Sequence, residues 1–248
     1  MDDDDLLEVL NGAADAVAAV LGPLEDWGLA GTRAGQYHSD LAADAAAVTL
    51  LTDAGLGVLS EESGIHDGQR KILVALDPVD GSTNAAHRLP WYATSLCALD
   101  EAGARAAVVV NQSSGVRYEA VRGSGATRDG RAIAPSPCAD LGTALVGLSG
   151  LPPRHLGWAQ FRALGAAALD LCAVAEGLVD GYVDCSPHAH APWDYLGAVL
   201  VCREAGAGVV DAYGRDLVAR GWSDRRTPVA AGTAELLAQL VAVRSTFD

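Results

Sequence analysis

The sequence predicts a mixed α and β fold in which helices are layered on sheets. The first observation is an amphipathic pattern between Asp5 and Leu21, where apolar residues recur at spacings of three and four. The second is a series of short apolar runs between residues 56 and 122, which is typical of strands. The third is an alternation of helical and strand-like segments after residue 137, and this alternation favours helices packed on a sheet.

In the first half of the chain, two helices are expected to precede the strands. The first follows the four aspartates at residues 2–5, which stabilise the N-terminal end of a helix dipole. The second is alanine-rich, runs from about Leu41 to Ala54 and ends near Gly55. Strands are expected at 56–60, 71–76, 93–99 and 105–111, and a hairpin with glycine-bearing turns starts at residue 116.

The composition changes around residues 134–137, where two prolines flank a serine. We place a boundary there, between an α+β part at 1–137 and an α/β part at 138–248. In the second part, strands are expected at 143–148, 178–184, 207–212 and 228–231, and helices at 157–177, 194–206 and 233–243.

Length and composition limit the class of protein. The chain has 248 residues, half of them hydrophobic, which is enough for a sizeable core. Its five cysteines form no CxxC pair, so neither a zinc site nor a disulfide framework is indicated, and we expect a reducing cytoplasm. No signal peptide is indicated and no apolar run reaches about 18 residues, so we expect no membrane partner.

The net charge of −15 argues against a nucleic-acid partner, because binding to a phosphate backbone requires clustered Lys and Arg. A small phosphorylated metabolite is compatible with this charge, since bound cations can reverse the potential inside one pocket. Most of the 32 acidic residues are expected on a solvated surface. We therefore look for function where acids follow apolar runs.

Several carboxylates lie at the ends of apolar segments. Hard cations such as Mg²⁺ prefer oxygen ligands, so acids from separate segments that converge in a fold would suit them. Zinc is less expected without a set of Cys and His ligands. The clusters are Asp40 with Asp44, Glu61 with Glu62, Asp77 with Asp80, and Asp194.

The stretch "LDPVDGSTNA", residues 76–85, follows an apolar run. Pro78 would fix a turn that aims the carboxylates of Asp77 and Asp80, and the carbonyl of Val79, at neighbouring metal positions. The alternative is an ordinary turn, because Asp-Pro and Asp-Gly are common turn dipeptides.

The next residues of this stretch suit a phosphate. The backbone N–H groups of Gly81, Ser82 and Thr83 could begin a helix whose positive end meets a phosphate group. The hydroxyl groups of Ser82 and Thr83 could also orient a water. Taken alone, the same residues could be a helix cap.

Three ordered motifs, "SEES", "DPVDGSTN" and "PWDYLGAVLVCREAGAGVVD", carry a resemblance to a known family. They resemble the Gly-Glu-Glu-Ser, Asp-Pro-Ile-Asp-Gly-Thr-x-Asn and Trp-Asp-x-Ala-Ala segments of the inositol monophosphatase family. That family is a branch of the metal-dependent, lithium-sensitive phosphatases that include fructose-1,6-bisphosphatase and bisphosphate nucleotidases. Weaker similarity at "GSGATRDGRAIAPS" and "LGAAALDLCAVAEGLVDGYVD" extends the resemblance over most of the chain from about residue 38.

The resemblance implies a layered α-β-α-β-α sugar-phosphatase fold and a set of site residues. Ser82 would orient the attacking water with help from Asp44 and Glu61, and Glu62 would act only indirectly. The implied metal ligands are Glu61, Asp77, Asp80, Asp194 and the main-chain carbonyl of Val79. The implied substrate contacts are Gly81, Ser82, Thr83, Ala167, Asp184 and Asp194.

The activity implied is hydrolysis of a small phosphate monoester by water activated with two or three Mg²⁺ ions. Mn²⁺ is the alternative metal, Li⁺ is an expected inhibitor, and the family often forms homodimers. Other activities stay open: 3′(2′),5′-bisphosphate nucleotidase, fructose-1,6-bisphosphatase and histidinol-phosphatase. A non-catalytic protein that binds a metabolite is a further alternative. The candidate cations for a second phosphate are few, which favours a monophosphate: Arg88, Arg154, Arg162 and Arg203.

The sequence departs from the family at the edge of the expected pocket. Residues 36–38 stand where the family has a lysine, and Ala85 stands where it has an aromatic residue. The stretch "CSPHAHAP" before Trp193 is longer than usual and carries His188 and His190. We expect a solvated loop there, with contact to the substrate as the second interpretation and metal binding as the third.

Overall fold

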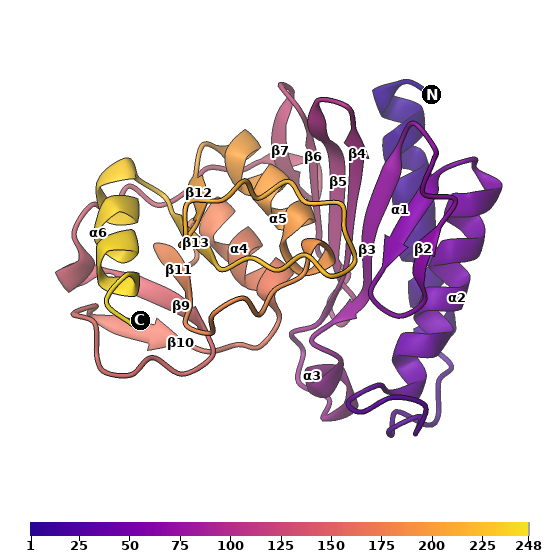
Figure 1. The fold of residues 1–248 in the computed structure, drawn as a ribbon, viewed down its shortest axis with the longest axis horizontal. Helices are drawn as coiled ribbons and strands as arrows, with labels where there is room; N and C mark the ends of the chain where they lie inside the picture. Colours follow the sequence, from indigo (N-terminus) through magenta and orange to yellow (C-terminus); the bar gives the residue numbers. More distant parts are fainter. Residues whose placement is uncertain (248) are drawn as a thin grey trace.

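In the computed structural model, which describes residues 1–247, helices and sheets alternate in five layers (Figure 1). Helices α1 (Asp3–Leu21) and α2 (His38–Asp53) cover one face of the first sheet. Helices α4 (Ala167–Ala175) and α5 (Pro192–Ala205) lie between the two sheets, and α6 (Ala234–Arg244) covers the outer face of the second sheet. This α-β-α-β-α layering confirms the predicted fold class.

The first sheet has eight strands in the order β2-β1-β3-β4-β5-β6-β7-β8. Strands β1 and β3 are parallel, and the other neighbours are antiparallel. The strands are β1 (Gly57–Ser60), β2 (Gly64–His66), β3 (Leu73–Asp80), β4 (Ala93–Asp100), β5 (Gly103–Asn111), β6 (Arg117–Val121), β7 (Gly125–Arg128) and β8 (Arg131–Ala132). A short helix, α3 (Ser82–Ala86), follows β3.

The second sheet has five strands in the order β10-β9-β11-β13-β12. Strand β9 is parallel to β10 and β11, and β13 is antiparallel to β11 and β12. The strands are β9 (Leu145–Ser149), β10 (Gln160–Arg162), β11 (Gly181–Asp184), β12 (Gly208–Asp211) and β13 (Pro228–Ala231), and a 3₁₀ turn, η1 (Leu141–Thr143), precedes β9. The division of the chain at residue 137 stays a prediction.

The layer between the sheets is apolar and closely packed. All nine residues of α4 are buried, and so is most of α5. Helix α5 approaches β4 at Gly197, where a Cβ atom would lie 3.0 Å from Ser95 Oγ and 3.2 Å from the Leu96 carbonyl oxygen. The small residue therefore lets the N-terminal end of α5 lie directly on the first sheet.

The predicted helix at 157–177 is wrong over its first half. Residues 160–162 form β10, and the helix begins only at Ala167. Gly157 and Gly165 have φ angles of +100° and +87°, which a helix does not allow. Along residues 1–247, no helix is both long and apolar enough to cross a lipid bilayer.

Candidate metal and phosphate site

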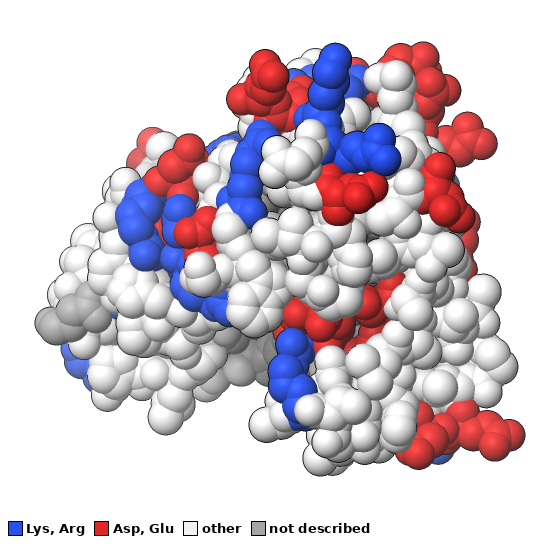
Figure 2. Space-filling view, turned by 45° about the vertical axis from the view of Figure 1, so that its right-hand side comes forward, with Lys and Arg blue, Asp and Glu red and all other residues white. Residues whose placement is uncertain are grey.

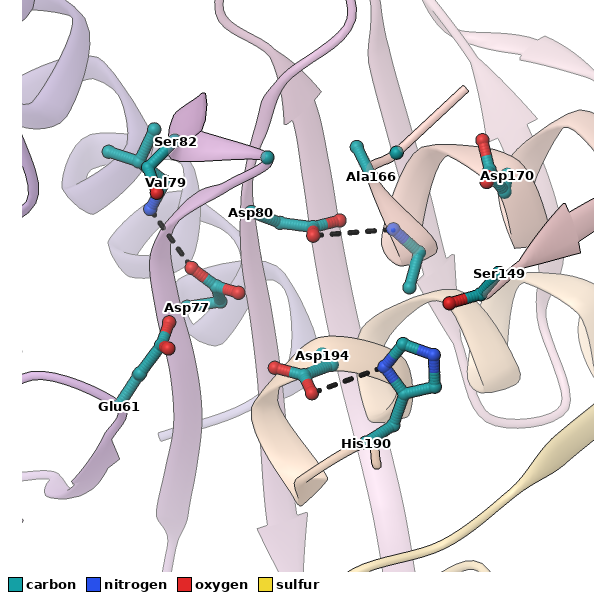
Figure 3. A pocket seen from close by; sticks show the side chains of 13 residues that line it. Glu61, Asp77, Val79, Asp80, Ser82, Ser149, Ala166, Asp170, His190 and Asp194 are labelled. Atoms are coloured by element: carbon teal, nitrogen blue, oxygen red, sulfur yellow. Dashed lines mark hydrogen bonds and ion pairs between the residues drawn. The ribbon is translucent and has the colours of Figure 1, made fainter. Parts of the chain in front are cut away.

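A cavity of about 260 Å³ lies where the C-terminal end of β3 meets the N-terminal ends of α4 and α5. Figure 2 shows acidic side chains in a hollow of the molecular surface, and Figure 3 shows the cavity from close by. Among the described residues that line it, none is Lys or Arg. The lining is Glu61, Asp77, Val79, Asp80, Gly81, Ser82, Ser149, Gly165, Ala166, Ala167, Asp170, His190 and Asp194.

Three carboxylates converge at one side of this cavity. One carboxylate oxygen from each of Glu61, Asp77 and Asp194 lies within 4.8 Å of the others. Glu61 follows β1, and its N–H donates to the carbonyl of Leu76 at 3.2 Å. Because β1 and β3 are parallel, their carboxyl ends meet at the same edge of the sheet. This pairing brings Glu61 to Asp77.

A β-bulge explains why Asp77 and Asp80 both line the cavity. Residues three apart in a regular strand point to opposite faces of the sheet. Here Asp77 pairs with Ser95 but Asp80 pairs with Ala93, so β3 holds one extra residue. The N–H of Val79 donates to Asp77 Oδ1 at 3.0 Å inside this bulge. The expected turn at Pro78 is therefore a bulge within β3.

Asp80 faces helix α4 rather than the other three carboxylates (Figure 3). Its Oδ1 accepts from the N–H of Ala167 at 3.2 Å, and its Oδ2 accepts from the N–H of Ala168 at 2.7 Å. The N-cap residue of α4 is Ala166, which has no side-chain acceptor. Asp80 therefore caps α4 from a distant part of the chain, with its charge at the positive end of the helix dipole.

Asp194 is held at the start of α5. Pro192 is the first residue of this helix, a position that suits proline. Asp194 Oδ2 accepts from the N–H of Ala191 at 2.8 Å and lies 3.3 Å from His190 Nδ1. The carboxylate therefore enters the cavity with one oxygen already hydrogen-bonded.

The electrostatics of this cluster favour a bound cation. Burial, followed by the neighbouring charge of Asp194, raises the pKa of Glu61 to about 8 and that of Asp80 to about 8. Burial and the Glu61 carboxylate raise the pKa of Asp77 well above its usual value. The donor set consists of oxygens, which fits a hard divalent cation such as Mg²⁺ better than zinc.

A second cavity of about 250 Å³ adjoins the first and shares Glu61 and Ser82 with it. Asp40 lines this second cavity, and its carboxylate accepts from the N–H of Tyr37 at 2.8 Å. Burial raises the pKa of Asp40 to about 6. The remaining lining is Arg33, Ala34, Gly35, Glu62, Trp193, Trp222 and Arg225.

The structure brings Asp40, rather than Asp44, to the predicted catalytic residues. Asp44 is buried, accepts a hydrogen bond from the hydroxyl of Ser60, and lines neither of these two cavities. The two aspartates are four residues apart in α2 and so lie on one face of the helix. That spacing is why the sequence alone could not separate their roles.

The other predicted substrate contacts are only partly brought together. Gly81 lines the first cavity with a φ of +84°, a conformation that favours glycine, and Ala167 lines it too. Thr83 lines neither cavity, and its hydroxyl lies 3.3 Å from that of Tyr37. Asp184 is fully buried behind the first cavity and does not line it.

Sequence reasoning missed Asp170 and Ser149, which line the first cavity. Asp170 lies in α4 one turn after Ala167, and its Oδ1 accepts from the indole N–H of Trp91 at 2.7 Å. An acid in an otherwise apolar helix was the available signal. Burial raises the pKa of Asp170 to about 7.

The expected solvated loop around the two histidines is wrong for His190. Its side chain is only 13% exposed and lines the first cavity. His188 is exposed, as expected, and its ring lies 4.7 Å from that of Tyr213. Burial lowers the pKa of His190, but the hydrogen bond to Asp194 and the charges of Asp194, Asp184 and Asp80 together outweigh burial and raise the pKa to about 9.

The five-layer fold and its carboxylate-lined cavity place the chain in a class of layered α/β proteins that includes phosphatases. A family model described as the inositol monophosphatase family matches residues 40–246. The chain therefore belongs to the inositol monophosphatase family.

Individual relatives carry different names. A fructose-1,6-bisphosphatase from Pyrococcus furiosus is 29% identical over 198 residues, which are 78% of this chain and 77% of the relative. A putative Nus factor SuhB from Neisseria meningitidis serogroup B is 34% identical over 204 residues, which are 76% of this chain and 75% of the relative. The structure of an inositol monophosphatase from Anabaena (Nostoc) superposes with a TM-score of 0.83 at 26% identity, covering 99% of this chain and 97% of that one.

Proposed function

We propose that the protein hydrolyses a small phosphate monoester with the help of Mg²⁺ held by Glu61, Asp77 and Asp194. The observation that carries the proposal is the convergence of these three carboxylates within 4.8 Å. Asp80 and the carbonyl of Val79 complete the proposed ligand set. When bound, Mg²⁺ would lower the pKa of a water and neutralise charge on the phosphoryl oxygens.

The residues shared by the two cavities suit the positioning of that water. Ser82 and Glu61 line both cavities, and Asp40 lines the second one. We assign to Asp40 the role that the family resemblance implied for Asp44, because Asp40 and Ser82 line the same cavity. The backbone N–H groups of residues 81–83 stay our proposal for the phosphate contacts.

The leaving group of the substrate would occupy the side of the first cavity formed by Ser149, Asp170 and Ala167. The described lining there carries one carboxylate and one hydroxyl but no Lys or Arg, which supports an alcohol without a second phosphate. The four arginines considered from the sequence line neither of the two cavities. Arg33, in the second cavity, is already paired with Glu62 at 2.8 Å.

Two alternatives remain relevant because of the relatives. The similarity to the Pyrococcus enzyme favours a bisphosphatase. The similarity to a relative named as a Nus factor favours a non-catalytic role. The complete carboxylate set supports catalysis, since a protein without catalysis has no need to retain Glu61, Asp77, Asp80 and Asp194 together. We also propose a homodimer, as the family resemblance implies, and a cytoplasmic location, as the cysteine usage of the sequence predicts.

A substrate panel tests these proposals. Phosphate release would be measured from inositol 1-phosphate, histidinol phosphate, fructose 1,6-bisphosphate and 3′-phosphoadenosine 5′-phosphate, with Mg²⁺ and with EDTA. We expect Mg²⁺-dependent release, and fastest from a monophosphate. Preference for a bisphosphate would refute the assignment of the leaving group, and no release from any substrate would favour the non-catalytic alternative.

A further inference from the structure

The imidazole of His190 lies between the second sheet and the carboxylate cluster (Figure 3). Its Nδ1 is 3.3 Å from Asp194 Oδ2. On the opposite side of the ring, Nε2 is 3.1 Å from the hydroxyl of Tyr182 and 3.7 Å from Asp184 Oδ2. Tyr182 and Asp184 are both fully buried and lie two residues apart on β11, so they share one face of that strand.

The backbone around His190 is also fixed. Its N–H donates to the carbonyl of Arg226 at 3.2 Å, and the N–H of Arg226 donates back to the carbonyl of His190 at 2.7 Å. Pro192 starts α5 two residues later. The ring therefore has little freedom to leave the position that its two nitrogen contacts define.

These contacts determine how Asp194 presents its carboxylate. Oδ2 is used by the N–H of Ala191 at 2.8 Å and by His190. The other oxygen of Asp194 lies on the side of Asp77 and Glu61 (Figure 3). A carboxylate held at one oxygen cannot rotate freely, so its second oxygen is oriented before a cation arrives.

We propose that His190 is a positioning residue for the metal site: Nδ1 holds Asp194, while Nε2 anchors the ring to Tyr182 and Asp184. The inference rests on the proposed function, because it requires Asp194 to be a metal ligand. Hydrogen-bond partners of metal ligands contribute about 10- to 100-fold to metal affinity in proteins. His190 belongs to this class of residue.

Two amide substitutions separate the two sides of the ring. The side-chain nitrogen of His190→Asn can occupy the position of Nδ1 and still reach Asp194. The side-chain nitrogen of His190→Gln can instead occupy the position of Nε2 and reach Tyr182. His190→Ala removes both contacts. His188→Asn is the matched control, because His188 belongs to the same loop but is exposed.

The test is the dissociation constant for Mg²⁺ of the metal-free, full-length protein, measured by calorimetry. We expect His190→Ala and His190→Gln to bind at least about tenfold more weakly, with His190→Asn within about threefold of the original protein. Thermal unfolding of each metal-free variant verifies that it is folded, and the comparison of Asn with Gln stands even if the Ala variant does not fold.

Specific results would overturn the inference. In the first, His190→Gln binds Mg²⁺ as tightly as the unsubstituted protein or more tightly. In the second, the Asn and Gln variants bind Mg²⁺ equally weakly. If the unsubstituted protein binds Mg²⁺ and the His190 variants bind equally well, only the inference fails. If the unsubstituted protein binds no Mg²⁺, the proposed function fails together with it.

Discussion

Asp80 and Ala168, 88 residues apart in the chain, are joined by a 2.7 Å hydrogen bond from the backbone N–H of Ala168 to Asp80 Oδ2. The bond connects the end of β3 in the first sheet to the start of α4, the helix that lies against the second sheet. A proposed metal ligand thus also fixes the helix that forms one wall of the cavity. The geometry of the site and the packing of the two sheets are therefore linked.

The first prediction separates these two roles of Asp80. Asp80→Ala should lose activity and leave the N–H groups at the start of α4 without their acceptor. Adding Ala166→Ser supplies a side-chain cap, which should recover about 0.5–2 kcal/mol of unfolding free energy without recovering activity. In the protein that keeps Asp80, Ala166→Ser should raise the unfolding free energy by less than it does in the Asp80→Ala background. Urea unfolding in EDTA measures these four proteins, and equal gains in both backgrounds would show that Asp80 does not cap α4.

The second prediction concerns Asp40 and Asp44. Asp40→Asn should lower turnover by about 100-fold or more, the usual effect of losing a group that handles a proton in the reaction. Asp44→Asn should instead lower the unfolding free energy by about 1 kcal/mol through its bond to Ser60 and leave turnover nearly unchanged. Steady-state kinetics and urea unfolding distinguish the two. The reverse pattern would restore Asp44 as the catalytic aspartate.

The third prediction is that protons and Mg²⁺ compete for the carboxylate cluster. The folded-state pKa values of Glu61 and Asp80, about 8, exceed the values near 4 of unfolded carboxyls, so the folded protein binds more protons. Without metal, stability should therefore fall as the pH rises from about 5 to 8.

Mg²⁺ should restore most of that stability at pH 8 and little of it at pH 5. A difference of about 5 °C or more in the shift of the melting temperature would be readily measured. Thermal unfolding with and without Mg²⁺ across this pH range provides the comparison. A shift that does not depend on pH would mean that the ion binds elsewhere.

The fourth prediction uses Asp170, which no sequence motif assigned. Asp170→Asn keeps an acceptor for the indole N–H of Trp91 and removes the carboxylate from the leaving-group side of the cavity. We expect KM for the best substrate to change by more than threefold with kcat little affected, because the residue lies away from the three converging carboxylates. A loss confined to kcat would instead indicate a part in the chemical step.

The sequence indicated which carboxylates gather in one place, because carboxylates after apolar runs are rare and costly, and Glu61, Asp77 and Asp194 do converge. The stretch from Asp77 to Ser82 carried most of that signal. It could not show the bulge, because an extra residue is visible only when β3 is paired with β4. The choice of Asp40 over Asp44 depends on how α2 is rotated against the first sheet, and local spacing does not determine that rotation.

The second half of the chain was harder to predict. The segment 157–177 is rich in alanine and leucine and favours a helix by propensity, but its glycines and its pairing with β9 override that preference. His190 sits in a polar, proline-flanked sequence that is typical of exposed loops. Its burial results from backbone pairing with residue 226, which is distant in the sequence.

The most direct measurement is the rate of phosphate release by the purified protein as a function of Mg²⁺ concentration, compared with Asp77→Asn. We predict no release in EDTA, saturable release with Mg²⁺, and a loss of about 1,000-fold or more in the variant, because charge stabilisation by the metal supplies much of the rate. Release that persists in EDTA, or near-original activity of folded Asp77→Asn, would contradict it.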